Sequence, residues 1–133
     1  MYAAARGVTR RYGETLAEVG LTYPQYLAML ALWDAATPLT VGDIGGRLRL
    51  DSGTLTPVLK RLENAGLVAR ERDAADERRV LVRVTEDGHA LRARVADVPE
   101  RVWAGTGLQA ADAQQLRGLL DRLLSGLDAS SPT

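Results

Sequence analysis

The sequence has 133 residues, 46% hydrophobic and 26% charged, which is typical of one globular domain small enough to gain stability by pairing. It contains no cysteine, which excludes a disulfide framework and a thiol nucleophile within these residues, and it shows neither a membrane-spanning run nor a signal-peptide pattern. Taken together, these features lead us to expect a cytoplasmic protein. Because 17 cations balance 17 anions, a generic polyanion binder is disfavoured.

Positive charge is concentrated in the middle of the chain. Residues 47–83 carry nine cations and six anions, a net charge of +3, whereas residues 1–46 and 84–133 are each slightly acidic. Contact with phosphate groups requires a local positive surface of this kind. The middle segment is therefore the place where the sequence favours a nucleic-acid interface.

The first helix is expected over residues 1–19. Tyr2, Tyr12 and Leu16 fall on one helical stripe within it, and the chain turns at Gly20. The stripe is already in pattern at the first residue, with no capping sequence before it. We therefore expect this helix to begin upstream of the given sequence.

Two further helices are predicted by their capping boxes. Residues 22–25 form the first box and open a helix, after which Leu39 is expected to pair as a short edge strand. Thr40 and Asp43 form the second box. The helix that follows contains Gly45-Gly46, which costs about 1 kcal/mol per glycine relative to alanine. Close approach to a neighbouring helix would explain this pair.

The segment from Asp51 to Gly66 predicts a helix with two different faces. Asp51 caps its start, Gly66 ends it in a left-handed turn, and Pro57 removes one backbone hydrogen bond, so that we expect an irregular first turn. Its apolar face consists of Leu55, Val58, Leu59 and Leu62. Its polar residues suit a helix that lies in a DNA major groove: Ser52, Thr54, Thr56, Lys60 and Arg61. Taken alone, the segment fits an ordinary amphipathic surface helix equally well.

Two strands are expected beyond this helix. Residues 67–72 and 80–84 are runs of strand length, and the polar residues 73–79 join them. The helix capped by Thr40 and the helix from Asp51 form a helix-turn-helix. A strand pair with such a loop after it makes a wing.

The rest of the chain predicts two long helices. The first is capped by Thr85 and bends at Pro99, and residues 105–107 end it. The last helix carries a leucine stripe that one small neighbour cannot cover, which favours a helical dimer interface, with an intramolecular core as the alternative: Leu108, Leu116, Leu119, Leu120, Leu123, Leu124 and Leu127. Residues 128–133 are expected to be a frayed tail.

Three motifs together resemble the MarR family of winged-helix transcription regulators: residues 51–57, residues 59–68 and the Asp-Glu-Arg of residues 76–78. Residues 21–27, together with residues 50–57, look like the organic-hydroperoxide-responsive branch. The resemblance implies a mainly α fold with a small antiparallel β wing. It implies one MarR-like domain over residues 1–133, with a winged helix-turn-helix over 22–85 and dimerisation helices over 1–20 and 86–127.

The resemblance also implies a function. A homodimer would bind double-stranded DNA at a pseudo-palindromic operator, with the helix from Ser52 in the major groove, and would repress a nearby gene. Arg78 matches the family's wing arginine, which reaches the minor groove, and Asp76 matches the acid that orients it. Arg79 is a weaker match. We expect Arg70, Arg72 and Arg83 to be solvated cations of the strands.

In the hydroperoxide-responsive branch the sensor is a cysteine whose thiolate is held by tyrosines. Tyr12 and Tyr23 match those tyrosines, and Tyr2 matches a third aromatic position, although core packing of Tyr12 and Tyr23 stays an alternative. The matching cysteine position falls about one helical turn before Tyr2, outside the given sequence. We expect either that a segment is missing there or that the signal is not a peroxide.

Two other functions stay open. In one, the protein binds DNA and a small apolar or phenolic ligand releases it; in the other, the winged helix binds only protein. The sequence offers no nucleophile with a base and an orienting group, so we predict no enzyme, no catalytic residue, no metal site and no cofactor. His89, the single histidine, is expected at the surface.

Overall fold

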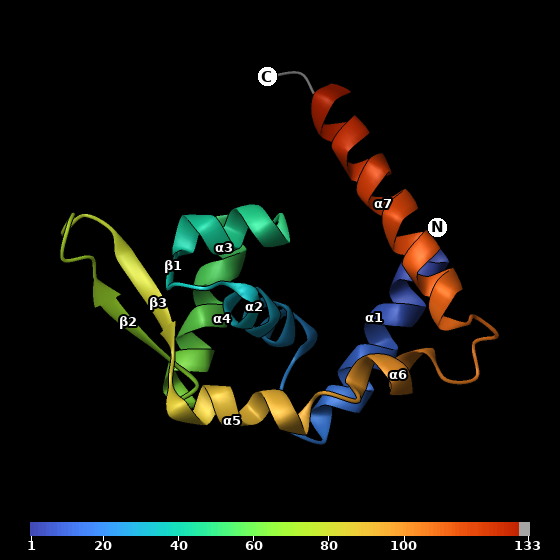
Figure 1. The fold of residues 1–133 in the computed structure, drawn as a ribbon, viewed down its shortest axis with the longest axis horizontal. Coiled ribbons are helices and arrows are strands. Elements are labelled where there is room, and N and C mark those ends of the chain that lie inside the picture. Colours follow the sequence, from blue (N-terminus) through green and yellow to red (C-terminus); the bar gives the residue numbers. More distant parts are fainter. Residues whose placement is uncertain (131–133) are drawn as a thin grey trace. The chain divides into compact units, whose positions relative to one another are not determined.

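The computed structural model describes residues 1–130. The chain divides into two compact units, Met1–Val102 (unit 1) and Trp103–Thr133 (unit 2). Seven helices and three strands are found among the described residues (Figure 1), in this order: α1 (Tyr2–Ala17), α2 (Tyr23–Asp34), β1 (Leu39–Thr40), α3 (Val41–Leu48), α4 (Ser52–Asn64), β2 (Val68–Arg72), β3 (Val80–Val84), α5 (Glu86–Arg94), α6 (Val98–Trp103) and α7 (Ala110–Ser130). The predicted fold class, mainly α with a small antiparallel wing, is confirmed.

Both predicted capping boxes are present. The Thr22 hydroxyl accepts from the Gln25 N–H at 3.3 Å, and the Gln25 Oε1 accepts from the Thr22 N–H at 2.8 Å, so α2 begins with two of its otherwise unpaired donors satisfied. Thr40 and Asp43 make the same reciprocal pair at the start of α3, both at 3.0 Å. The helix starts are thus set by local sequence.

Helix α4 is continuous, so the expected irregular first turn is wrong. The Asp51 Oδ1 accepts from the Thr54 N–H at 2.7 Å, and the Leu55 N–H donates to the Asp51 carbonyl at 3.0 Å, so the first turn is regular. The hydrogen bond that Pro57 cannot make would have ended on Gly53, which is exposed. Water can therefore bind that carbonyl at little cost.

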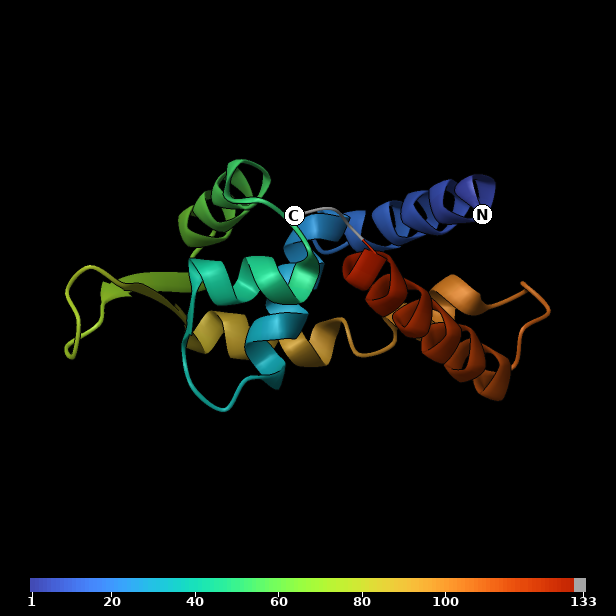
Figure 2. The same ribbon diagram turned by 90° about the horizontal axis from the view of Figure 1, so that it is seen from above.

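A three-stranded antiparallel sheet has the order β1-β3-β2, so β1 is the predicted edge strand. The register of the β2–β3 pair runs from Val68↔Val84 to Arg72↔Val80. In both Figure 1 and Figure 2 the loop that joins these strands extends away from the helices of unit 1. This hairpin is the predicted wing.

The hydrophobic core of unit 1 surrounds α2, which contacts α1, α3, α4, α5 and β3. The apolar face of α4 is part of this core, with Leu55, Leu59 and Leu62 fully buried. Trp33 of α2 donates its Nε1–H to the carbonyl of Gly88 in α5 at 3.1 Å, in a buried position. The core therefore holds α4 with its polar face turned outward.

The helix after the wing is interrupted, whereas the sequence predicted one helix bent at Pro99. Helix α5 ends at Arg94, a turn follows, and α6 starts at Val98. Pro99 lies in the first turn of α6, where it needs no donor, and its ring would clash with the Val95 carbonyl if the helix ran through. Helix α6 is tied to α1 because Arg11 Nη1 donates to the Val102 carbonyl at 2.8 Å.

In unit 2, α7 extends to Ser130, so the tail expected to fray from Asp128 is helical as far as the structure describes it, and residues 131–133 lie outside the described residues. Leu108 precedes the helix instead of belonging to it. No residue of Ala110–Ser130 is buried. Among the described residues, no helix is both long enough and apolar enough to cross a membrane.

Candidate nucleic-acid interface

The predicted DNA-binding side chains of α4 lie on the exposed side of the helix. Its buried residues are Leu55, Val58, Leu59 and Leu62. The five predicted contact residues are all exposed: Ser52, Thr54, Thr56, Lys60 and Arg61. The structure therefore presents three hydroxyls and two cations together on one helical surface. Their contact with DNA stays a prediction.

The tip of the wing presents a fixed arginine. The Arg78 Nε lies 3.3 Å from Asp76 Oδ1, and the same carboxylate oxygen accepts from the Arg78 N–H at 3.1 Å. The Arg78 side chain is nevertheless 92% exposed. A carboxylate thus aims a solvated guanidinium from a projecting loop, which is the arrangement that the sequence predicted for this pair.

Arg79, the weaker match, points to a different partner. Its Nη1 lies 3.8 Å from Asp73 Oδ2, and its backbone carbonyl accepts from the Asp73 N–H at 2.9 Å. These interactions close the base of the wing loop. Because half of the Arg79 side chain remains exposed, it can add positive charge beside Arg78.

Arg72 is exposed, as expected of a strand cation, but it also makes a specific hydrogen bond. Its Nη1 donates to the backbone carbonyl of Glu77 at 2.7 Å, across the wing loop. Arg83 has the expected surface pairing, with its Nε 3.7 Å from Glu71 Oε2. Composition alone does not separate these two arginines, but strand register does, because Arg72 is the last residue of β2 and faces the loop.

Tyr12 and Tyr23 stack, although the sequence lacks the cysteine that they would hold. Their ring centroids are 4.4 Å apart with an interplanar angle of 12°, and Tyr26 adds a third ring 5.9 Å from Tyr12. Tyr26 was not among the tyrosines that the resemblance matched to a sensor. Its spacing of three residues from Tyr23 places both rings on one side of α2 and would have revealed the cluster.

The tyrosine cluster favours neutral phenols. Burial, followed by the charges of Tyr12 and Tyr23, raises the pKa of Tyr26 to about 12. Burial and Tyr12 also raise the pKa of Tyr23 above its ordinary value. Any oxygen or sulfur acceptor that reaches the cluster would therefore meet protonated hydroxyl groups.

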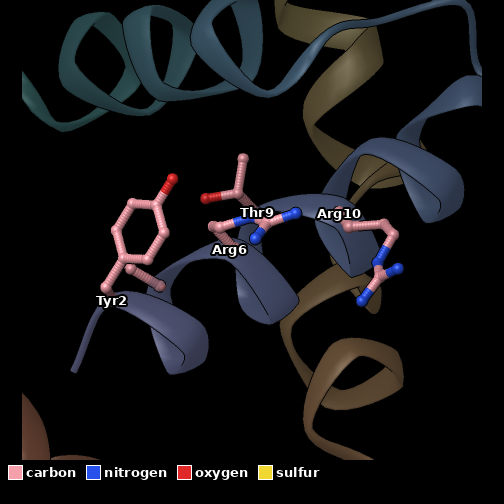
Figure 3. A pocket seen from close by; sticks show the side chains of 5 residues that line it. Tyr2, Arg6, Thr9 and Arg10 are labelled. Carbon is pink, nitrogen blue, oxygen red and sulfur yellow. The ribbon is translucent and has the colours of Figure 1, made fainter.

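Tyr2 is not part of this cluster. It is ten residues before Tyr12 on the same helix, about 15 Å along its axis. The residue is 77% exposed, and the Arg6 guanidinium lies over its ring. Figure 3 shows Tyr2, Arg6, Thr9 and Arg10 projecting from α1. With Ala5 they line an open cavity of about 380 Å³ on the surface of this one helix. The three predicted sensor tyrosines thus divide between two places.

Residues 1–130 include no group of three or more His, Cys, Asp and Glu side chains placed to hold a metal ion. His89 is exposed on α5. The features that the structure assembles are a polar helix face, a projecting arginine and a tyrosine cluster.

Comparisons with known proteins agree with this geometry. A sequence model of the family described as transcriptional regulator SarA/Rot matches residues 10–95. The organic hydroperoxide resistance transcriptional regulator of Bacillus subtilis is 45% identical over 127 residues, which cover 96% of this chain and 86% of that protein.

Solved structures show the same fold. AbfR of Staphylococcus epidermidis, in the structure of its reduced form bound to DNA, has a TM-score of 0.76 and 34% identity, over 95% of this chain and 87% of that one. The crystal structure of MarR has a TM-score of 0.74 at 23% identity, over 94% and 92% of the two chains. The chain belongs to the MarR/SarA family of winged-helix transcription regulators.

Proposed function

We propose that the protein is a homodimeric transcription regulator that binds double-stranded DNA with α4 in the major groove and the wing in the flanking minor groove. One observation carries the proposal: the exposed polar face of α4 and the exposed, carboxylate-oriented Arg78 belong to the same compact unit. Similarity to AbfR, solved on DNA, supports it. A pseudo-palindromic operator follows from two-fold symmetry, and repression is the expected effect.

The two parts of the interface do different work. Lys60 and Arg61 neutralise phosphate, and the hydroxyls of Ser52, Thr54 and Thr56 donate to phosphates or base edges. Arg78 enters the minor groove, where a narrow A·T-rich segment concentrates negative potential. The helix therefore fixes most of the position of the protein along the DNA, and the wing adds a preference for A·T base pairs in the flanking sequence.

Dimerisation is proposed through the terminal helices. The leucines of α7 and Leu108 are each between 36% and 55% exposed, so they form a continuous apolar stripe on the surface. Exposed apolar patches of this kind mark surfaces that bind another protein. A second copy of the stripe is the self-complementary surface that a two-fold dimer uses. For such a regulator we propose a cytoplasmic location and a function that uses no catalytic residue.

The test is a selection from a random DNA pool with the intact protein, followed by a salt titration on the selected duplex. We expect an inverted repeat whose half-sites lie about one helical turn apart, and an affinity that falls steeply with salt. Lys60→Ala should weaken binding on every sequence and reduce the salt slope by about 1. Recovery of no sequence, together with no binding to any duplex at low salt, would favour a module that binds only protein.

The inducer is proposed from two observations. The tyrosine cluster corresponds to the sensor region of the hydroperoxide-responsive branch, to which the Bacillus relative belongs by name. However, the 133 residues contain no cysteine, so they supply no thiol for a peroxide to oxidise. The second candidate is therefore the small apolar or phenolic ligand expected from the sequence. Because the open cavity on α1 combines a tyrosine ring with two guanidinium groups, a phenol that also carries a carboxylate would suit it.

The two inducers are distinguished by duplex binding in the presence of each. Salicylate should weaken DNA binding and raise the melting temperature of the free protein, and Arg10→Ala should reduce both effects, if the cavity is the sensor. Cumene hydroperoxide should then have no effect on these 133 residues. The opposite pattern, release by peroxide and no response to salicylate, would reject the ligand-binding candidate.

A further inference from the structure

The peptide group between Glu77 and Arg78 is held at both of its polar atoms. Its carbonyl oxygen, on Glu77, accepts from Arg72 Nη1 at 2.7 Å. Its N–H, on Arg78, donates to Asp76 Oδ1 at 3.1 Å. A peptide plane held in this way cannot rotate without losing a hydrogen bond. The direction in which Arg78 leaves the loop is therefore fixed by two side chains, one at the carbonyl edge of the peptide and one at its N–H edge.

The two side chains act from different places. Asp76 belongs to the loop itself, and its carboxylate also reaches the Arg78 Nε at 3.3 Å. Arg72 is the last residue of β2 and is paired with Val80 of β3, so its guanidinium extends from the ordered sheet. Asp76 thus orients the arginine within the loop, and Arg72 connects the loop to the strand pair.

The backbone bonds of the loop do not replace this connection. The Asp73 N–H donates to the Arg79 carbonyl, and the Arg79 N–H donates to the Asp76 carbonyl, both at 2.9 Å. They close the loop, but neither reaches the Glu77 carbonyl. A hydrogen bond from a guanidinium is also shorter and stronger than one between neutral groups. Arg72 is therefore the side chain that holds the outer end of the loop.

We infer that Arg72 is a positioning residue for Arg78, holding the peptide from which the minor-groove arginine projects without contacting DNA itself. The inference rests on the proposed function, since it assigns Arg72 a role in the wing contact. It predicts that the effect of removing Arg72 depends on Arg78 being present. An arginine that bound phosphate directly would instead act independently of Arg78.

Two variants serve as matched controls. Arg83→Ala removes the same charge from the neighbouring strand, where the Arg83 Nε lies 3.7 Å from Glu71 Oε2. Arg72→Lys keeps a positive charge and a hydrogen-bond donor near the Glu77 carbonyl. Melting temperatures of all variants are measured alongside, and we expect Arg72→Ala to match the wild type because the side chain is exposed.

The experiment is a double-mutant cycle of Arg72→Ala and Arg78→Ala, read as affinity for the selected duplex with A·T or G·C flanks. Arg72→Ala should lower affinity about threefold to tenfold on A·T flanks and narrow the preference for them. In the Arg78→Ala background it should add no further loss. Arg72→Lys should restore most of the preference, and Arg83→Ala should affect both flanks equally.

Three results would overturn the inference. If Arg72→Ala weakens both flanks equally, adds fully to Arg78→Ala and lowers the salt slope by about 1, then Arg72 binds phosphate directly. If Arg72→Ala has no effect while Arg78→Ala abolishes the flank preference, the Arg72–Glu77 hydrogen bond is dispensable and the proposed function stands. If Arg78→Ala itself changes nothing, the wing contact fails, and the positioning role fails with it.

Discussion

Two adjacent glycines in α3 differ in what a side chain would meet. A Cβ at Gly45 would lie 2.9 Å from the Leu50 carbonyl oxygen and 3.6 Å from the Leu55 Cδ2, whereas a Cβ at Gly46 would meet nothing within 4 Å. The close approach expected from the sequence is therefore real at Gly45 and absent at Gly46. Gly45 lets the turn between α3 and α4 fold back on α3.

This difference gives a matched pair of variants. Gly45→Ala should lower the free energy of unfolding by about 1–3 kcal/mol, since backbone atoms must move to admit the methyl group. Gly46→Ala should raise it by up to about 1 kcal/mol, because alanine is the better helix former. Denaturant unfolding of both proteins checks the prediction. Equal effects of the two substitutions would contradict it.

Tyr26 predicts a dependence of stability on alkaline pH. Burial is the main cause that raises its pKa in the folded protein from 10.0 to about 12. Because the folded state favours the neutral phenol, this contribution to stability is complete below pH 10 and is lost as pH rises from 10 to about 12.

The measurement is the free energy of unfolding between pH 9 and 12. Tyr26→Phe removes the titrating group, so its stability should fall less steeply than that of the wild type across this window. Parallel curves for Tyr26→Phe and wild type would show that the buried phenol is not the cause.

At the residue scale, the sequence predicted which residues have a role better than it predicted which residues they contact. Asp76 and Arg78 could be paired in advance because they are two residues apart in a recognised motif. The Arg72–Glu77 contact could not, since it depends on the β2–β3 register and on the path of the loop. Tyr26 was missed because an apolar helix face and an aromatic cluster have the same spacing.

At the scale of elements, α4 depends on its N-terminal cap. The hydrogen bond from the Thr54 backbone lowers the pKa of Asp51, so the cap stays charged in mildly acidic solution. Asp51→Ala should lower the free energy of unfolding by about 1 kcal/mol, and Asp51→Asn should preserve it because asparagine caps equally well. Thermal unfolding checks both. An Asn variant as unstable as the Ala variant would contradict this role.

Element boundaries followed the sequence wherever a cap or a glycine marked them. Thr22, Thr40, Asp51 and Thr85 all begin helices as predicted. The two prolines were misjudged in opposite ways. Pro57 is accommodated within α4 because the carbonyl it leaves unpaired is exposed, whereas Pro99 stands at a full break between α5 and α6. Solvent access to one carbonyl and a clash with another are properties of the folded chain.

At the scale of the whole molecule, the leucines of α7 predict assembly. Leu120 is 41% exposed near the middle of the stripe, and Ser125 lies on the opposite side of the helix at 100° per residue. Leu120→Asp would bury a charge in the proposed interface and should raise the dimer dissociation constant at least about a hundredfold. Ser125→Asp should leave it unchanged.

Sedimentation equilibrium of the two variants measures this difference. A dimer that survives Leu120→Asp as well as it survives Ser125→Asp would show that the stripe is not the interface. The sequence indicated an unusually rich stripe, but it could not identify the surface that covers it, because one chain holds only half of a two-fold interface. Of the proposed dimerisation helices in residues 1–20 and 86–127, this measurement tests α7.

The central claim is that one unit of this protein reads DNA with α4 and the wing together. The most direct test compares Arg78→Ala with Arg94→Ala, an equal change of charge on α5, for binding to the selected duplex with A·T or G·C flanks. Arg78→Ala should lose about tenfold or more on A·T flanks and little on G·C flanks, while Arg94→Ala should bind both like the wild type. An unchanged affinity of Arg78→Ala for the A·T-flanked duplex would contradict the account.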